Sequence, residues 1–390
     1  MDKAKLQELD NQYIAHVYSR EDVAVATGKG AVCHSADGKR YIDFSSGIGV
    51  NSLGFCDPEW TRAVSRQAGV LQHTSNLYYT EPCALLAEKL VARTGLKKVF
   101  FGNSGAEANE GAIKAARKYS FDKYGAGRHE IITLLNSFHG RTMAALSATG
   151  QEDFHEFFHP FSEGFKYVAA NETDALLNAA GDKTCALMIE MIQGEGGVVP
   201  LTRDFVRAAA KMCAERDILL IVDEVQTGAG RTGKFFAYEH FGVNPDLVTA
   251  AKGLGGGLPI GAVLFGEKCE NAFGAGDHGS TFGGNPVVCA GGLVVMDRID
   301  EAFLRGVREK SEYMTGRLKL MKNVVRISGM GLMLGIEIEG KTAHEALRYC
   351  VENGLLILSA KDKIRLLPPL VISREEIDEG LEILEQAIAG

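Results

Sequence analysis

The sequence predicts an α/β protein with a mostly parallel central sheet in a large domain and a smaller α+β domain. Between about residue 95 and residue 265, apolar runs of strand length alternate with helical stretches, as in parallel sheets buried on both faces. The chain has 390 residues, which is too long for one compact core. In the last hundred residues, helical patterns flank short strands such as 331–337, and a final helix is expected from 374 to about 389.

Six apolar runs are predicted as strands of the large sheet. They are 98–101, 130–135, 185–189, 218–222, 246–251 and 260–265. Two further strands are predicted within residues 31–44, around a turn at Asp37 and Gly38, and this hairpin is expected to join the smaller domain. The predicted divisions are an N-terminal segment joining the small domain (1–54), a large domain (55–286) and a C-terminal small domain (287–390).

Composition excludes several classes of protein. The formal net charge of -8 argues against a nucleic-acid partner or an anionic membrane surface, because both require a basic face. No apolar run is long enough to span a bilayer, and the charged N-terminus has no signal-peptide pattern. The eight cysteines form no C-x-x-C pair and are typical of a reduced, cytoplasmic protein.

Polar side chains follow five of the predicted strands. In open α/β sheets, ligands bind beyond the carboxyl ends of the strands, so these side chains are expected to converge on one site. The residues at these strand ends are Ser104 with its neighbours Gly105 and Ala106, the aromatic Phe138 with Arg141, Glu190 with Glu195, Asp223 with Gln226, and Lys252.

Three of these positions indicate chemistry. Residues 104–107 match a capping box that opens a helix predicted from 105 to about 120. The simpler interpretation is a helix cap alone. The functional interpretation adds a phosphate bound at the free N–H groups of the helix. Most lysines are solvated, but Lys252 lies between a buried strand and a glycine run, where desolvation favours nucleophilic attack on an aldehyde. Asp223 can cap a turn, bind magnesium or pair with a protonated ring nitrogen.

Two other motifs point elsewhere and are disfavoured. Residues 228–234 nearly match a P-loop, but Phe235 replaces the magnesium-binding Ser/Thr, and the acidic strand precedes the loop by only a few residues. A nucleotide-binding protein that uses this loop is the alternative from a different class of protein, and these departures disfavour it. His155 and His159 have zinc-like spacing without an open catalytic pattern, so no metal is expected.

Taken together, the motifs resemble the class III (ornithine-type) aminotransferases, which are fold-type I pyridoxal phosphate enzymes, and within them the acetylornithine branch. The resemblance runs nearly end to end. Its motifs lie at 43–54, 75–82, 103–109, 138–141, 193–197, 223–226, 251–257, 280–285 and 365–369. The three glycines after Lys252 and the block from Ser75 favour the acetylornithine branch, whereas Met191 stands where proline is usual.

The resemblance implies pyridoxal 5′-phosphate as cofactor, with Lys252 as its Schiff-base lysine and Asp223 as the second catalytic residue. The implied cofactor contacts are Ser104, Gly105 and Ala106 at the phosphate, Phe138 and Val225 on the two ring faces, Asp223 at the pyridine nitrogen, Gln226 at the ring hydroxyl, and Thr281 at the phosphate of the neighbouring subunit in a homodimer.

The resemblance also implies a substrate site. Arg141 is expected to bind the α-carboxylate of the acylated substrate, Arg365 that of glutamate, and Glu195 is expected to pair with Arg365 when the other substrate is bound; Ser280 belongs to the same site. The implied reaction moves the terminal amino group of N2-acetyl-L-ornithine to 2-oxoglutarate, giving N-acetyl-L-glutamate 5-semialdehyde and L-glutamate for arginine biosynthesis. Ornithine, succinylornithine and 4-aminobutyrate are alternative donors, and an aminomutase or racemase is an alternative outside transamination.

Overall fold

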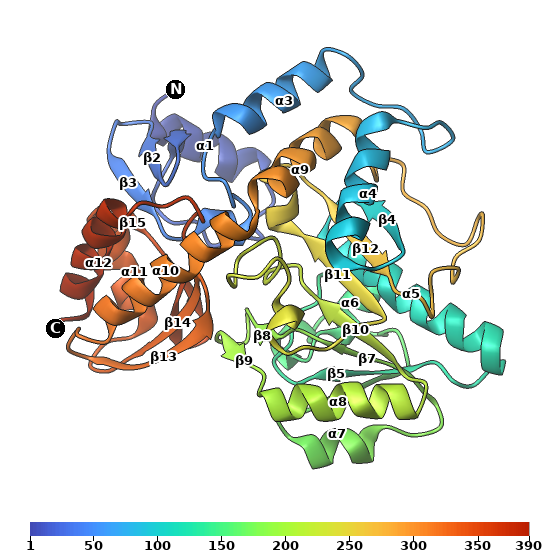
Figure 1. The fold of residues 1–390 in the computed structure, drawn as a ribbon. Coiled ribbons are helices and arrows are strands. Elements are labelled where there is room, and N and C mark those ends of the chain that lie inside the picture. The colour runs from blue at the N-terminus through green and yellow to red at the C-terminus, as the bar shows by residue number, and fades with distance from the viewer. Residues whose placement is uncertain (390) are drawn as a thin grey trace.

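The computed structural model describes residues 1–389 and builds them around one seven-stranded sheet and two four-stranded sheets (Figure 1). The strands of the larger sheet are β4 (Lys98–Gly102), β5 (Glu130–Leu134), β6 (Phe165–Val168), β7 (Thr184–Ile189), β10 (Leu219–Asp223), β11 (Leu247–Ala251) and β12 (Gly261–Phe265). Their order is β4-β12-β11-β10-β7-β5-β6, and β12 alone runs against its neighbours in this sheet. The prediction of a mostly parallel sheet is therefore confirmed.

All six predicted strands lie in this sheet, and the prediction missed the seventh strand, β6. This strand forms one edge of the sheet, and most of its residues are only partly buried. An edge strand does not need the continuous apolarity that marks the inner strands, so its sequence gives a weak signal.

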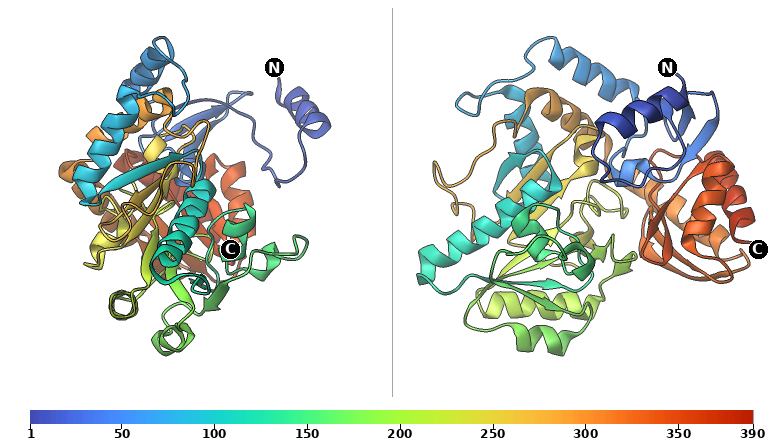
Figure 2. Two further views of the ribbon diagram at one scale, coloured as in Figure 1. Left: turned by 90° about the vertical axis from the view of Figure 1, so that its right-hand side faces the viewer. Right: turned by 180° about the vertical axis from the view of Figure 1, so that it is seen from behind.

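Helices cover both faces of the large sheet (Figures 1 and 2). One face is covered by α4 (Glu81–Thr94), α7 (Thr173–Ala179), α8 (Arg203–Glu215) and α9 (Pro286–Arg298), and the other by α5 (Gly105–Tyr124) and α6 (Met143–Ala148). Within β10, Leu220 and Val222 pack into the first core, while Leu219 and Ile221 pack into the second. Since both faces are dry, polar groups on these strands are found mainly at their ends.

The remaining part of the chain forms two four-stranded sheets. Their strands are β1 (Val25–Lys29), β2 (Val32–Ser35), β3 (Arg40–Asp43) and β15 (Leu355–Leu356), and then β13 (Val324–Met330), β14 (Met333–Ile338), β17 (Lys363–Leu366) and β16 (Leu358–Ala360). The predicted hairpin corresponds to β2 and β3, with Gly38 at φ 87° in its turn. β3 pairs in parallel with β15, so the N-terminal hairpin shares a sheet with the C-terminal part of the chain.

Three helices pack on these smaller sheets: α10 (Glu301–Leu318), α11 (Ala343–Glu352) and α12 (Arg374–Ile388). The shorter elements are α1 (Lys3–Tyr13), α2 (Ser46–Gly49), α3 (Pro58–Ala68), β8 (Ile192–Gln193), β9 (Val199–Pro200), and the 3-10 turns η1 (Glu152–Phe154), η2 (Ala237–His240) and η3 (Lys252–Gly255). Helix α1 buries no side chain and stands away from the body of the protein (Figure 2, left). Among residues 1–389, no helix has the length and apolarity to cross a membrane.

The two cores meet along α10. Leu304 packs in the core of the large sheet, and Val307, one turn later, packs in the core of the smaller sheets. The division of the chain after residues 54 and 286 stays a prediction, and residue 390 of its last segment lies outside the described residues.

Helix α12 packs so closely on the N-terminal segment that only glycine fits at position 380. A Cβ added to Gly380 would overlap the buried ring of Phe44. Gly380→Ala is therefore expected to lower the free energy of unfolding by about 1–3 kcal/mol, as measured by denaturant unfolding. Gly316→Ala is the matched control, because a Cβ at this position of α10 meets no atom within 4 Å. The control is expected to leave stability unchanged or to raise it by up to about 1 kcal/mol; similar losses in both variants would contradict the packing argument.

Candidate active site

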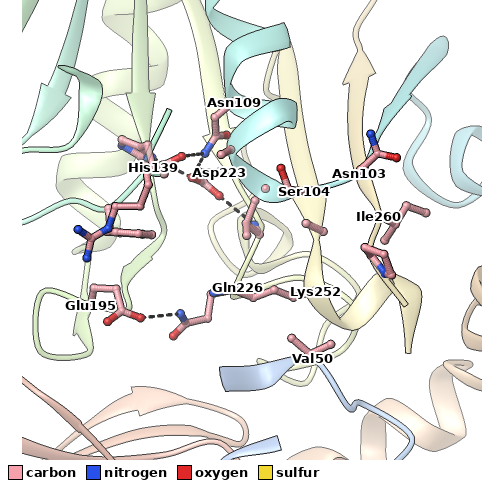
Figure 3. Close-up of a pocket in the computed structure, with 18 of the residues that line it drawn as sticks. Val50, Asn103, Ser104, Asn109, His139, Glu195, Asp223, Gln226, Lys252 and Ile260 are labelled. Atoms are coloured by element: carbon pink, nitrogen blue, oxygen red, sulfur yellow. Dashed lines mark hydrogen bonds and ion pairs between the residues drawn. The ribbon is translucent and has the colours of Figure 1, made fainter. Parts of the chain in front are cut away.

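A cavity of about 510 Å³ lies at the carboxyl ends of the parallel strands (Figure 3). Its walls come from the segments that follow β4, β5, β7, β10 and β11, together with Val50 from the N-terminal segment. The predicted site residues in its lining are Ser104, Gly105, Ala106, Phe138, Arg141, Glu195, Asp223, Val225, Gln226 and Lys252. The structure thus gathers most of the predicted residues around one space, whose size suits a small ligand.

The N-terminus of α5 provides the part of the cavity suited to an anion. Ser104 Oγ accepts a hydrogen bond from the Glu107 N–H at 3.1 Å, as the predicted cap requires. The other half of the predicted capping box is wrong, because the Glu107 carboxylate accepts from the Asn103 N–H, one residue before the cap. The N–H groups of Gly105 and Ala106 have no acceptor within the helix, and both residues line the cavity.

Val225 leaves no space for a side chain at position 105. A Cβ on Gly105 would lie 2.6 Å from Val225 Cγ1, well inside van der Waals contact. Glycine at this position therefore lets the start of α5 approach the segment after β10, which carries two more residues of the cavity wall, Gln226 and Val225 itself.

Asp223 is the most firmly held carboxylate of the cavity. Its Oδ2 accepts from Asn109 Nδ2 and His139 Nδ1, each at 2.8 Å, and its Oδ1 accepts from the Val225 N–H at 2.9 Å (Figure 3). Asp223 is only 3% exposed, so these donors fix both its position and its orientation. The roles of Asn109 and His139 were missed from the sequence, although a lone asparagine among the alanines on the buried face of α5 was a usable signal.

Glu190 is a second buried carboxylate whose role was not assigned from the sequence. It accepts from the Phe138 N–H at 3.1 Å and from the Gly194 N–H at 3.2 Å. Burial raises the pKa of its carboxyl to about 7, although the neighbouring His139 opposes the rise. Glu190 therefore ties together the loops that carry Phe138 and Glu195, two other residues of the lining.

Lys252 directly follows β11 and has a left-handed backbone, with φ at 44°. That conformation is unusual for a residue with a side chain and often marks a functional position. Burial lowers the pKa of the Lys252 ammonium, while the carboxylate of Glu195 opposes the fall. The glycine run behind the lysine is anchored by Trp60, whose Nε1 donates to the Gly255 carbonyl at 3.1 Å.

Arg365 reaches the site from β17 of a smaller sheet. Its Nη1 donates to Glu195 Oε1 at 2.6 Å and to Gln226 Oε1 at 3.3 Å. Burial alone would raise the pKa of the Glu195 carboxyl, but the Arg365 guanidinium holds that pKa below its usual value. The pair is therefore charged, and it joins residues 170 positions apart in the sequence.

Arg141 presents a contrasting environment. Its side chain is exposed, and its guanidinium stacks on Phe154 at 3.9 Å from the ring centroid and faces Phe138 at 5.6 Å. Within residues 1–389 it forms no ion pair with a carboxylate. Arg141 lines the cavity and is thus available for an anionic ligand, whereas Arg365 contacts the lining residues Glu195 and Gln226 without being part of the lining and is already paired.

Ser280 and Thr281 are not brought into this cavity. They line a separate hollow of about 320 Å³, and Ser280 Oγ accepts from Asn103 Nδ2 at 3.0 Å. Thr281 is exposed, and its neighbour Phe282 is 58% exposed. Their predicted contacts, with the neighbouring subunit and the substrate, stay predictions.

The loop of residues 228–234 does not have the form of a phosphate-binding loop. Most of it is buried, and its N–H groups are used internally: Gly230 N–H donates to the Phe235 carbonyl at 3.2 Å, and Gly233 N–H to the Gly230 carbonyl at 3.0 Å. Because residues 228–233 are buried and several of their N–H groups are bonded internally, the loop does not present an open N–H cradle to solvent, which argues against the nucleotide-binding alternative.

Comparison with known proteins agrees with this geometry. A family model described as "Aminotransferase class-III" matches residues 13–388. The acetylornithine aminotransferase of Haemophilus ducreyi is 50% identical over the whole of both chains, and that of Caldanaerobacter subterraneus is 48% identical over 97% of this chain and 98% of the relative.

Two solved structures show the same similarity in three dimensions. The N-acetylornithine aminotransferase of Stenotrophomonas maltophilia is 36% identical and superimposes with a TM-score of 0.84 over 98% of each chain. The ornithine aminotransferase of Toxoplasma gondii is 31% identical, with a TM-score of 0.94 over 100% of this chain and 95% of the other.

Proposed function

The chain belongs to the class III aminotransferases, and we propose that it moves the terminal amino group of N2-acetyl-L-ornithine to 2-oxoglutarate, in the synthesis of arginine. The products are N-acetyl-L-glutamate 5-semialdehyde and L-glutamate. The observation that carries this proposal is the difference between the two arginines: Arg365 is neutralised by Glu195, whereas Arg141 is free. This arrangement fits a donor whose terminal amine lies near the neutralised Arg365 and whose carboxylate is bound by Arg141, because an unpaired cation near the amine would be unfavourable.

Enzymes of this class depend on pyridoxal 5′-phosphate, and the residues of the cavity fit that cofactor. Ser104 Oγ and the N–H groups of Gly105 and Ala106 suit its phosphate, and the buried Asp223 suits a protonated ring nitrogen. Phe138, Val225 and Gln226 line the same cavity; in this proposal Phe138 and Val225 would cover the two faces of the ring, and Gln226 would bond the ring hydroxyl. When bound, the cofactor supplies an aldehyde for the amine and an electron-accepting ring.

Lys252 would hold the cofactor covalently through Nζ. When it is not bonded to the cofactor, the same Nζ would be free to take a proton from the substrate carbon and to return it. The lowered pKa of Lys252 favours both tasks, because a neutral amine can act as a nucleophile and as a base. Asp223, whose carboxylate is fixed by its hydrogen bonds, would keep the ring nitrogen protonated.

Glu195 and Arg365 would allow one cavity to accept two substrates in turn. While the donor is bound, the pair remains closed and shields the amine of the donor from the guanidinium charge. Glutamate or 2-oxoglutarate brings an α-carboxylate that can take the place of Glu195 on Arg365. Arg141 would hold the α-carboxylate of the acylated donor.

We also propose that the enzyme is a homodimer in which Thr281 reaches the cofactor phosphate of the partner. Support comes from a set of strongly exposed apolar side chains on the segments around residues 77–79 and 282. They are Leu77, Tyr78, Tyr79 and Phe282.

A cytoplasmic location is proposed as well, since all eight cysteines are free.

The function is tested by measuring the first half-reaction from the spectrum of the cofactor with four donors. N-acetylornithine is expected to react with the highest kcat/KM, ahead of ornithine, succinylornithine and 4-aminobutyrate, and each turnover is expected to form one glutamate from 2-oxoglutarate. A different preferred donor would correct the substrate, and turnover without glutamate would indicate a mutase or racemase.

Lys252→Ala in the same assay is expected to abolish turnover, a loss of more than about a thousandfold. Lys211→Ala is the matched control, because Lys211 is exposed on α8 and its ion pair with Glu215 is a weak surface pair. Turnover by Lys252→Ala at a near wild-type rate would overturn the mechanism.

Glu195→Ala is expected to affect the two half-reactions differently. It leaves Arg365 unpaired beside the donor amine, so kcat/KM for N-acetylornithine is expected to fall roughly tenfold or more, while glutamate reacts as well as before or better. Glu195→Gln, which removes the charge but keeps a hydrogen-bond acceptor, is expected to give an intermediate effect. Equal losses for both substrates would contradict the exchange of partners on Arg365.

Mixed dimers test the proposed contact of Thr281. The mixed dimer contains one Lys252→Ala chain and one Thr281→Val chain. If Thr281 serves the site of the partner, the site that keeps Lys252 receives the intact Thr281 of the other chain, and one complete site is formed. Half of the sites are then expected to react with wild-type cofactor affinity. If Thr281 served its own subunit, no intact site would exist in the mixed dimer, and that outcome would refute the proposal.

A further inference from the structure

The loop of residues 228–234 does not have the form of a phosphate-binding loop, yet it places a full positive charge inside the protein. Arg231 is 1% exposed and is among the largest side chains that are fully buried. Removing a guanidinium from water is costly, and burial lowers its pKa to about 9, with Asp43 as the opposing negative charge. Because burying the Arg231 guanidinium is costly, the hydrogen bonds that it makes are expected to have a role in the structure.

Arg231 links three segments that are far apart in the sequence. Its Nη1 donates to the Leu332 carbonyl at 3.0 Å and also to the Pro368 carbonyl. Its own carbonyl accepts from the Leu332 N–H at 2.9 Å, and Gly331, at φ 58°, allows this close approach. The loop after β10 is therefore joined both to the turn between β13 and β14 and to the segment that follows β17.

The segment after β17 depends on contacts of this kind. Leu366 is the last residue of β17 and pairs with Leu334, but Pro368 and Pro369 have no N–H to donate, so the strand ladder cannot continue through residues 367–369. The Leu367 carbonyl accepts from Ser46 Oγ, and the Leu367 N–H donates to the Phe44 carbonyl at 2.7 Å. Arg231 is the group that holds the next carbonyl, that of Pro368.

Arg365 lies three residues before Pro368, and the stretch from Gln226 to Arg231 contacts Arg365 at one end and the segment after β17 at the other. Gln226 Oε1 accepts from Arg365 Nη1 at 3.3 Å, while Arg231 holds the Pro368 carbonyl. Gln226 also lines the cavity next to Lys252 (Figure 3). A shift of residues 366–369 would therefore move the Arg365 guanidinium relative to the rest of the cavity.

We propose that Arg231 is a positioning residue for Arg365: together with Ser46 it fixes residues 366–369, and so sets where the Arg365 guanidinium meets the α-carboxylate of glutamate or 2-oxoglutarate. This inference rests on the proposed role of Arg365. The carboxylate of the acylated donor is assigned to Arg141, on the loop after β5, which Arg231 does not contact. The larger effect of Arg231 is therefore expected on the half-reaction in which the α-carboxylate of glutamate or 2-oxoglutarate meets Arg365.

Arg231→Lys tests the inference, because it keeps the charge but replaces the planar guanidinium, whose Nη1 donates to both carbonyls, by a shorter side chain. In single-turnover measurements on the holoenzyme, the glutamate concentration for half-maximal rate is expected to rise roughly ten- to hundredfold, since small misplacements of a clamp are costly. The N-acetylornithine concentration for half-maximal rate is expected to change by less than about threefold, as for a substitution distant from the site of the donor carboxylate. Equal losses for both substrates, or no loss for either, would overturn the inference.

The same substitution in an Arg365→Ala background separates this inference from the role of Arg365 itself. If Arg231 acts through Arg365, Arg231→Lys causes no further loss of glutamate affinity there, whereas an additive loss overturns the inference. If Arg365→Ala alone leaves glutamate affinity unchanged, the proposed role of Arg365 fails, and the inference fails with it.

Ser46→Ala provides a second variant, and it decides the matter if Arg231→Lys does not fold into holoenzyme. It removes only the hydrogen bond to the Leu367 carbonyl and leaves the buried charge in place. A loss of glutamate affinity of a few-fold, without a matching loss for N-acetylornithine, supports the inference. A uniform change or no change overturns it.

Discussion

Burial of both faces of the large sheet is the constraint from which the site follows. Because helices cover each face, a polar side chain on an inner strand has few places to lie other than the strand end. The parallel strands bring those ends to one edge, where the lysine, the aspartate and the start of α5 surround a single cavity. Only then do local contacts, such as the three bonds to Asp223, determine the orientation of each group.

Much of this arrangement was predictable from the sequence because it depends on local pattern. The inner strands are continuous apolar runs, and the residue types after them are readable one strand at a time. β6 escaped prediction because an edge strand lacks that pattern. The cap of α5 was predicted only in part, because Asn103 competes successfully for the Glu107 carboxylate.

Contacts between distant segments could not be derived from pattern alone. The pairing of Glu195 with Arg365 was expected from a family resemblance, since no local rule links positions 170 residues apart. The bonds of His139 and Asn109 to Asp223 were missed, although all three residues lie in conspicuous motifs. Residues 228–234 were correctly set apart from a P-loop, but the use of Arg231 as a buried link between segments has no signature in the sequence.

Trp60 gives the protein an intrinsic optical reporter. It is the one tryptophan of the chain, and its indole N–H is bonded to the glycine run three residues beyond Lys252. Tryptophan emission from this enzyme therefore originates at a single place near Lys252. Loading of a chromophore onto that lysine can be followed as quenching of that emission by resonance energy transfer, without adding a label.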